Sequence, residues 1–265
     1  MQSKNILITG ACGGLGRAAV LEFSGNGHKV FAADIVDGGW SDANIVPVYM
    51  DVSDEKSVSD AAKTVDKLDL IICLAGVYTM DSFVEISNDR LENMVEVNLM
   101  GVYRTVRAFF PKLTRPGGRI FIIASELAPL DPLPFNGIYS MTKRALDGYA
   151  HSLALELDLL GIRVTTVYPG AYGDGMTAAA VRAMERMSVS SKLYPDIAER
   201  FRSIVLKEIG TKKPPEDFAK KLVRLDGRRK PPFRVFVNNS VKLRLFSALP
   251  MSLQAFILRF LLKTR

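Results

Sequence analysis

The chain has 265 residues, of which 48% are hydrophobic, with two cysteines and a formal net charge of +7. This apolar fraction excludes an intrinsically disordered protein, two thiols exclude a disulfide scaffold, and the length fits one domain with a sizeable core. The charge is uneven, because residues 200–265 hold 17 Lys and Arg against 4 Asp and Glu, whereas residues 1–199 hold 18 against 24. An acidic body therefore carries a basic C-terminal quarter.

The first residues lead directly into the strand-like run Ile6-Leu7-Ile8, with no signal peptide before it and no membrane-spanning stretch after it. With so few thiols, we expect a reducing, cytoplasmic location. The basic quarter shows no recognition motif for nucleic acid, so we expect no nucleic-acid partner. No metal-binding motif is present either, and we expect no metal site.

Short apolar runs bounded by turn residues alternate with longer helical patterns. Strands are predicted at 4–9, 29–34, 46–50, 69–74, 118–124, 162–168 and 233–237, and the clearest helices at 14–25, 55–66, 88–114 and 139–160. Parallel neighbours need right-handed crossovers, so this order predicts an α/β fold. We expect a doubly wound parallel sheet of Rossmann type with about seven strands, whose ligands lie beyond the carboxyl ends.

The regular alternation stops after Tyr168, and about sixty residues of helical pattern precede the last predicted strand. An insertion beyond a strand end fits a substrate lid. We therefore expect one dinucleotide-binding domain, 1–265, that includes a lid over 171–230 and a basic amphipathic segment over 231–265.

A glycine-rich turn joins the first predicted strand to a helix. Glycines allow a tight turn close to a pyrophosphate, and the free N–H groups at the helix start favour the anion. The sequence therefore predicts a cofactor-phosphate site made of Thr9, Gly10, Cys12, Gly13, Gly14, Leu15 and Gly16.

Asp34 ends the second predicted strand, 24 residues after Gly10. This offset is typical of an acid that accepts hydrogen bonds from the adenosine ribose. The carboxylate would repel a ribose phosphate, and Ile35 and Val36 follow instead of a basic residue, so NAD is favoured over NADP. The alternative is that Asp34 simply starts a turn.

Asp51 and Val52 follow the third predicted strand. Both are candidates for contact with the adenine. A nearly equal alternative for Asp51 is that it caps the helix beginning near Glu55.

Tyr139 and Lys143 lie four residues apart at the start of a predicted helix, so both side chains share one face. A free phenol has a pKa of about 10 and is a poor base at neutral pH, but an adjacent positive charge stabilises the phenolate. Such a pair suits general acid–base catalysis. The same spacing also occurs on ordinary surface helices, so it needs support from its neighbours.

Three neighbours supply that support. Ser125 ends the fifth predicted strand, at the sheet edge where the tyrosine helix begins. Asn98 is a polar amide in an otherwise good helical pattern, which indicates a local break or a required hydrogen bond. Pro169-Gly170 ends the sixth strand with a rigid turn.

In this order and at these intervals, the residues resemble the short-chain dehydrogenase/reductase family across the whole chain. Thr9 to Gly16 match T-G-x-x-x-G-x-G, Tyr139 and Lys143 match Y-x-x-x-K, and Asn98, Ser125 and Pro169-Gly170 complete the pattern. The resemblance implies an NAD-dependent enzyme acting on CH–OH groups, usually a homodimer or homotetramer.

The resemblance also implies a role for each residue. Tyr139 would exchange a proton with the substrate oxygen, and Ser125 would hydrogen-bond that oxygen. Lys143 would lower the tyrosine pKa and hold the nicotinamide ribose, while Asn98 would support a water that relays the proton.

Two departures from the family pattern affect cofactor binding. Cys73-Leu74-Ala75-Gly76 stands where the family usually has Asn-Asn-Ala-Gly, so Ala75 and Gly76 remain beside the adenine while the asparagine role is not obviously filled. Asp174 occupies the place of a threonine that helps hold the nicotinamide, and Thr177 is the nearest substitute.

Apolar residues dominate the segment between Ser125 and Tyr139 and the segment beyond Gly170. Ligand pockets are usually apolar with few polar anchors, so a hydrophobic alcohol or ketone is favoured over a sugar. The candidate substrate contacts are Ser125, Leu127, Phe135, Tyr139, Ala171, Tyr172 and Met176. The alternative is that these apolar side chains only pack a lid or a subunit interface.

The last predicted strand and the residues after it loosely resemble the tails of the retinol and 17β-hydroxysteroid dehydrogenase branch, which implies a steroid-, retinoid- or lipid-like alcohol. The apolar residues Leu253, Phe256, Ile257, Phe260 and Leu261 follow one helical face, with Arg259 and Lys263 outside it. A basic amphipathic helix of this kind fits peripheral contact with an anionic membrane. The same stripe fits packing on the lid or on a partner subunit equally well.

The alternative to an enzyme is a protein that binds NAD but acts as a sensor or scaffold, since a fold does not determine a function.

Overall fold

The computed structural model describes residues 2–173, 175–208 and 212–262. Its centre is one seven-stranded sheet in the order β3-β2-β1-β4-β5-β6-β7, with every adjacent pair parallel. The strands are β1 (Asn5–Thr9), β2 (Lys29–Asp34), β3 (Ile45–Tyr49), β4 (Leu70–Cys73), β5 (Arg119–Ile123), β6 (Arg163–Pro169) and β7 (Arg234–Val237). The predicted strands and the doubly wound parallel sheet are confirmed.

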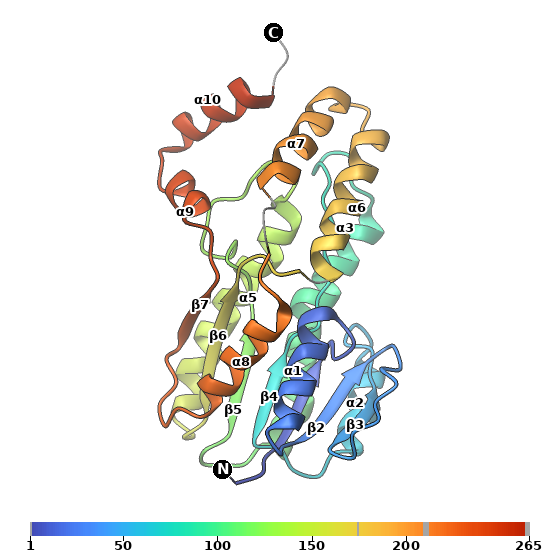
Figure 1. Ribbon diagram of the computed structural model, residues 1–265, viewed down its shortest axis with the longest axis vertical. Helices are drawn as coiled ribbons and strands as arrows, with labels where there is room; N and C mark the ends of the chain where they lie inside the picture. Colours follow the sequence, from blue (N-terminus) through green and yellow to red (C-terminus); the bar gives the residue numbers. More distant parts are fainter. Residues whose placement is uncertain (1, 174, 209–211, 263–265) are drawn as a thin grey trace.

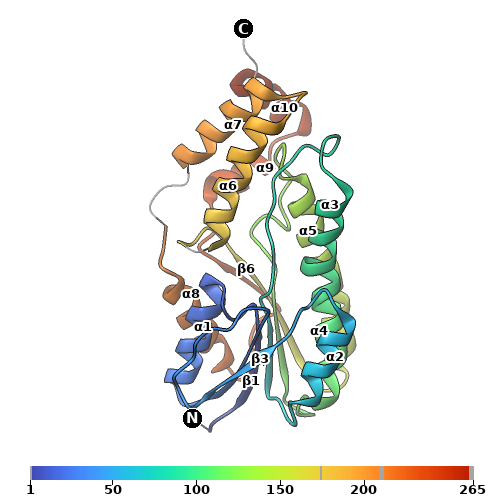
Figure 2. The same ribbon diagram turned by 90° about the vertical axis from the view of Figure 1, so that its right-hand side faces the viewer.

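Helices cover both faces of this sheet (Figures 1 and 2). One face carries α1 and α8, and the other carries α2, α4 and α5. The helices of these two layers are α1 (Gly14–Gly25), α2 (Glu55–Lys63), α3 (Asn88–Val95), α4 (Gly101–Phe109), α5 (Gly137–Asp158) and α8 (Pro215–Asp226). Because the strands are buried on both sides, their sequences are nearly continuous apolar runs.

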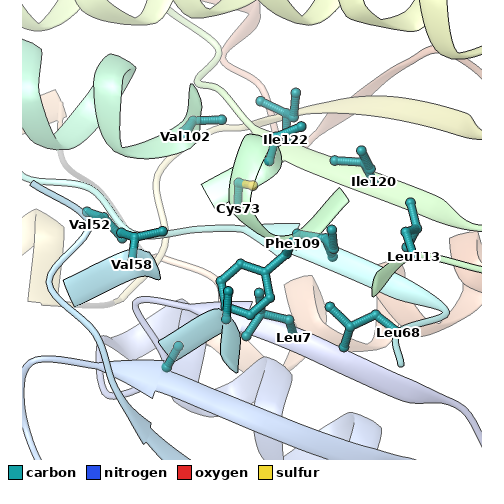
Figure 3. Close-up of a cluster of buried hydrophobic side chains, with 14 of the residues drawn as sticks. Leu7, Val52, Val58, Leu68, Cys73, Val102, Phe109, Leu113, Ile120 and Ile122 are labelled. Atoms are coloured by element: carbon teal, nitrogen blue, oxygen red, sulfur yellow. The ribbon is translucent and has the colours of Figure 1, made fainter. Parts of the chain in front are cut away.

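Alternate residues of each strand enter two separate apolar clusters. Leu7 lies in the cluster beneath α2, α4 and α5, whereas Ile6 and Ile8 lie in the cluster beneath α1 and α8. Figure 3 shows the first cluster around Phe109, which is fully buried. These two cores fix the positions of the strand ends, where the site forms.

The helix predicted over 88–114 is interrupted in its middle. Its parts are α3, a π-helical turn η1 (Glu96–Met100), α4 and a short 3-10 turn η2 (Phe110–Lys112). Asn98 lies in the π-helical turn, so the expectation of a local break or a required hydrogen bond at this residue is confirmed. π-Helical turns are rare and frequently occur at functional sites.

Four further helices complete the C-terminal third: α6 (Gly175–Ser190), α7 (Pro195–Glu208), α9 (Val241–Ser247) and α10 (Met251–Leu262). These four lie beyond the carboxyl ends of the strands, at the top of Figure 1. The lid over 171–230 stays a prediction, but within that range α8 packs beside α1 on the sheet. The reason is the apolar stripe of Phe218, Leu222 and Leu225, which joins the core cluster.

The basic quarter does not form one surface. Arg228, Arg229 and Lys230 are exposed between α8 and β7, at the amino end of the sheet, whereas Lys242 and Arg244 lie on α9 at the opposite end. Among the described residues, no single helix is long and apolar enough to cross a membrane. Within the part of the chain that the structure describes, one pair of helices, α9 and α10, reaches that length and apolarity when the two are counted together, and this pair is bent by 120° at its break.

Candidate active site

A cavity of about 1210 Å³ opens at the carboxyl ends of the strands. It begins at the glycine-rich turn, passes Ser125 and Tyr139, and continues between the helices beyond the sheet to α9 and α10. Parallel α/β sheets bind ligands at this edge.

The glycine-rich turn is shaped by close backbone contacts. Gly10 has a φ of +69°, and a Cβ there would lie 2.7 Å from the Cα of Ala75. A Cβ on Gly16 would overlap the carbonyl oxygen of Gly10. Both positions therefore require glycine if the turn is to keep its shape.

The other residues of the turn divide into two groups. Cys12, Gly13, Gly14 and Leu15 line the cavity, together with Gly10. Thr9 is buried beneath the turn, where its Oγ1 accepts hydrogen bonds from the backbone N–H groups of Leu74 (3.1 Å) and Ala75 (3.0 Å). This threonine ties β1 to the segment after β4, where the chain lacks the family's asparagines.

Asp34 lies at the cavity wall next to this turn. Its Oδ2 accepts a hydrogen bond from the Cys12 N–H (2.9 Å) and its Oδ1 accepts one from the Val36 N–H (3.1 Å). The carboxylate thus stabilises the turn and also lines the cavity, and its contact with the adenosine ribose stays a prediction.

Asp51 and Val52 also line the cavity. The cap of α2 is Asp54, whose side chain accepts from the Lys56 N–H (2.9 Å), and capping by Asp51 is therefore wrong. Asp51 instead accepts from the Ser53 N–H (2.8 Å), which holds its carboxylate near the cavity.

Tyr139 and Lys143 face the cavity from the first turns of α5, and both are buried. The Lys143 Nζ lies 5.8 Å from the centre of the Tyr139 ring and donates to the Ile123 carbonyl (3.1 Å). Burial lowers the pKa of Lys143 to about 8, so the side chain is still mostly protonated at neutral pH. The structure therefore places a cation beside the phenol.

The Tyr139 hydroxyl is surrounded by residues from three segments. It donates to the Met176 Sδ (3.6 Å), and the Tyr78 ring lies 4.8 Å from its own ring, centre to centre. The Tyr78 hydroxyl in turn donates to the Asn136 Oδ1 (3.0 Å). Ser125 lines the same cavity, and its Oγ accepts from the Leu127 N–H (3.2 Å).

The Asn98 side chain is completely buried and clamps the segment after β4. Its Oδ1 accepts from the Val77 N–H (2.8 Å), and its Nδ2 donates to the Val77 carbonyl (2.9 Å). A Cβ on Gly76 would lie 3.3 Å from the Asn98 Oδ1 and 3.7 Å from the Lys143 Nζ. Asn98 therefore holds Gly76 and Val77 against the buried lysine.

Pro169, Gly170 and Thr177 also line the cavity, at the end of β6 and the start of α6. The Thr177 hydroxyl donates to the Tyr172 carbonyl (2.6 Å), which orders the start of α6. Asp174 lies outside the described residues.

Six of the seven predicted substrate contacts line the cavity: Ser125, Leu127, Tyr139, Ala171, Tyr172 and Met176. Phe135 is not among the residues that line the cavity, and its contact with substrate stays a prediction. Its ring packs edge-on against Tyr194 (5.4 Å) and Phe201 (5.5 Å), and its backbone has a φ of +64°.

Sequence reasoning missed five polar cavity residues, which are Tyr78, Glu126, Asn136, Ser240 and Lys242. Tyr78 and Asn136 meet across 58 positions of sequence, so no local pattern reveals them. The one available signal was their proximity to residues already singled out, since Tyr78 follows Gly76 and Asn136 precedes Tyr139.

One cavity thus holds a glycine-rich turn at a helix start, the Asp34 carboxylate at the end of β2, and the buried pair Tyr139 and Lys143. This combination fits a nicotinamide dinucleotide bound beside a proton-transfer group. Fold and site together define a nucleotide-binding oxidoreductase. The sequence pattern of the family described as short chain dehydrogenase matches residues 4–185, and the chain belongs to this family.

Similar curated proteins agree with this assignment. An uncharacterized short-chain type dehydrogenase/reductase of Sinorhizobium fredii is 32% identical over 196 residues, which cover 72% of this chain and 77% of the relative. A 3-ketodihydrosphingosine reductase of Bacteroides thetaiotaomicron is 27% identical over 249 residues, which cover 91% of this chain and 90% of the relative.

Solved structures share the fold. A short chain dehydrogenase from Burkholderia cenocepacia in complex with NADP has a TM-score of 0.74 at 23% identity, with 99% of each chain covered. A 3-ketoacyl-(acyl-carrier-protein) reductase from Brucella melitensis complexed with NADH has a TM-score of 0.70 at 21% identity, covering 89% of this chain and 97% of the other.

Proposed function

We propose that this chain is an NAD-dependent dehydrogenase/reductase that interconverts a hydrophobic secondary alcohol and its ketone. The observation that carries the proposal is the apolar extension of the cavity beyond Ser125 and Tyr139. This extension is lined by Met176, Ala179 and Ala180 of α6, Phe201, Ile204 and Val205 of α7, Leu243 and Phe246 of α9, and Leu258, Leu261 and Leu262 of α10. Such a surface favours a steroid-, retinoid- or lipid-like substrate over a sugar.

Bound NAD would accept a hydride from the alcohol, or return it to the ketone in the reduced form. The residues of this chain then handle the proton. Tyr139 takes the hydroxyl proton during oxidation and returns it during reduction, while the Lys143 cation stabilises the phenolate. Ser125 hydrogen-bonds the reacting oxygen, and Asn98 keeps Gly76 and Val77 in place beside the lysine.

NAD is favoured over NADP because the Asp34 carboxylate faces the cavity where the adenosine ribose would lie. A phosphate on that ribose would meet a like charge. The name of the Bacteroides relative denotes reduction of a keto compound, which supports a ketone or alcohol substrate.

A panel of hydrophobic and polar alcohols, each offered with NAD and with NADP, tests the proposal. We expect NADH formation with the hydrophobic alcohols and at least about tenfold lower kcat/KM with NADP, which corresponds to about 1.4 kcal/mol. Activity confined to sugars, or faster turnover with NADP, would overturn these assignments. Cofactor binding without turnover of any compound would favour the NAD-binding sensor or scaffold instead.

We also propose that α10 rests on an anionic membrane surface. The apolar stripe predicted to pack or to meet lipid is largely exposed, with Phe256 67% and Phe260 74% accessible. The helix packs through its other side, where Leu258 and Leu262 join the cluster with α6 and α7. Arg259 lies next to the exposed stripe, where it can meet an anionic lipid headgroup. The cavity reaches the inner side of the same helix, so a substrate dissolved in the membrane would have a short path to the site.

Flotation with vesicles of phosphatidylglycerol and phosphatidylcholine tests this contact. Phe256→Glu with Phe260→Glu should lower the membrane partition coefficient at least roughly 100-fold, since burial of each large apolar side chain contributes about 1.5–3 kcal/mol and about 1.4 kcal/mol is tenfold. Leu159→Glu is the matched control, because Leu159 is 86% exposed at the end of α5, far from α10. Equal flotation of all three proteins would exclude α10 as the contact.

Members of this family commonly form oligomers, and we propose a homodimer or homotetramer here. Tyr103 of α4 and Met141 and Leu155 of α5 are exposed apolar side chains on the outer face of the sheet's helical layer. Light scattering after size exclusion would give the mass, and a monomer at micromolar concentration would contradict the proposal.

A further inference from the structure

Glu126 is a carboxyl group in the cavity wall, on the side of Ser125 and Tyr139 that leads to the apolar extension. It directly follows Ser125, is only 8% exposed and lines the same cavity as Tyr139. Acidic side chains are rarely buried to this degree unless they are paired. A buried carboxyl group beside the reacting centre therefore requires a reason.

The protein gives Glu126 only part of its hydrogen bonding. Its Oε2 accepts from the Ser240 N–H (2.6 Å), at the residue that caps α9. Its Oε1 lies near Gly170, where a Cβ would come within 3.2 Å of it. Within the described residues, no lysine or arginine forms an ion pair with this carboxylate.

The environment penalises an ionised Glu126 that has no cation beside it. Burial raises its pKa, and the Ser240 backbone N–H opposes this shift in part. A ligand that brings a positive charge next to the carboxylate would remove the penalty, because a paired buried charge costs much less than an isolated one. A hydroxyl group on the ligand would give a weaker hydrogen bond and no charge.

We propose that Glu126 is a specificity-determining residue that binds a primary ammonium group next to the reacting carbinol or ketone carbon of an otherwise apolar substrate. The inference rests on the proposed function, since it assumes that Ser125 and Tyr139 hold the reacting oxygen. Ser125 and Glu126 are adjacent in the chain and line one cavity, so a substrate whose oxygen meets Ser125 would present a neighbouring group to Glu126. The preferred substrate class is then a long-chain amino alcohol or amino ketone, with its alkyl chain in the apolar extension.

A competing explanation is that Glu126 only anchors the C-terminal segment. Glu126→Gln separates the two roles, because the amide oxygen still accepts from the Ser240 N–H while the charge is lost. Glu85→Gln is the matched control: Glu85 accepts from the Leu193 N–H (3.0 Å) and the Ser191 hydroxyl (2.7 Å), and so fixes the connection between α6 and α7 outside the cavity.

The experiment compares a long-chain alkan-3-ol with its 2-amino analogue as substrates. Glu126→Gln should lower kcat/KM for the amino alcohol at least about 30-fold and change that for the plain alcohol less than about threefold, because loss of a buried charge partner costs about 2 kcal/mol or more. Glu85→Gln should change neither value. Equal losses for both alcohols, or no loss for either, would show that Glu126 is structural and would leave the proposed function intact.

Calorimetry of the same two alcohols, with NADH present, makes the test independent of turnover. In a Tyr139→Phe background, the protein that keeps Glu126 should bind the amino alcohol at least about 30-fold more tightly than the protein that also carries Glu126→Gln. Equal affinities of the two proteins for the amino alcohol would overturn the inference. If the affinities differ but the unsubstituted protein turns over neither alcohol, the role of Glu126 is supported and only the proposed activity is rejected.

Discussion

Tyr139→Phe is expected to lower kcat by about 10²- to 10⁴-fold, with little change in cofactor affinity or in folding stability. The substitution removes only the phenolic oxygen, and general acid–base catalysis contributes about this much to a rate. The Tyr139 ring remains packed against Tyr78, so the cavity wall keeps its shape. Steady-state rates of NADH formation, together with NADH fluorescence titration, provide the two measurements.

Tyr149→Phe is the matched control for this variant. Tyr149 lies on the same helix, α5, but its ring packs near Tyr103 of α4 (6.4 Å between centres), on the outer side of the sheet. The control should retain activity within about twofold, because its phenol takes no part in proton transfer. Full turnover by Tyr139→Phe would contradict the proposed acid–base role and favour a sensor or scaffold that binds NAD.

The parts of the fold that the sequence predicts well depend on short-range patterns. The strands are apolar on both sides because the sheet is covered twice, and helices or turns separate them along the chain. Asp34, Ser125 and Pro169 each lie at or just after the end of a strand, so the parallel topology alone brings them to one edge. The same topology places Tyr139 there, at the start of the helix after β5.

The parts that the sequence did not predict depend on contacts between distant segments. An amphipathic pattern shows that α8 has an apolar face but not that this face packs beside α1. On α10, the polar Gln254 is buried and donates to the Asp131 Oδ2 (2.9 Å), while the apolar Phe256 is exposed. Periodicity therefore identified the apolar stripe of α10 but could not show which side of the helix meets the protein.

Gly16→Ala is expected to disrupt the cofactor site more than any other single-methyl change in the first helix. A Cβ at this position overlaps the Gly10 carbonyl oxygen, which belongs to the backbone and cannot rotate away. The turn would have to open, and it also carries the Cys12 N–H that donates to Asp34. We expect a loss of about 3 kcal/mol in the free energy of unfolding and at least about tenfold weaker NAD binding.

Gly25→Ala provides the comparison, because it adds the same methyl group at the other end of α1, where no atom beyond its chain neighbours and its own helix backbone lies within 4 Å of the new Cβ. Here the loss of backbone freedom in the unfolded chain should dominate, giving a gain of about 0.4–1 kcal/mol with unchanged NAD affinity. Thermal melts should then shift in opposite directions, downward by roughly 6–12 °C for Gly16→Ala at about 2–4 °C per kcal/mol. Similar melting temperatures for the two variants would contradict this prediction. They would mean that the glycine-rich turn can move to accept the methyl group added by Gly16→Ala, so that the contact between Gly16 and the Gly10 carbonyl does not fix the shape of the phosphate site.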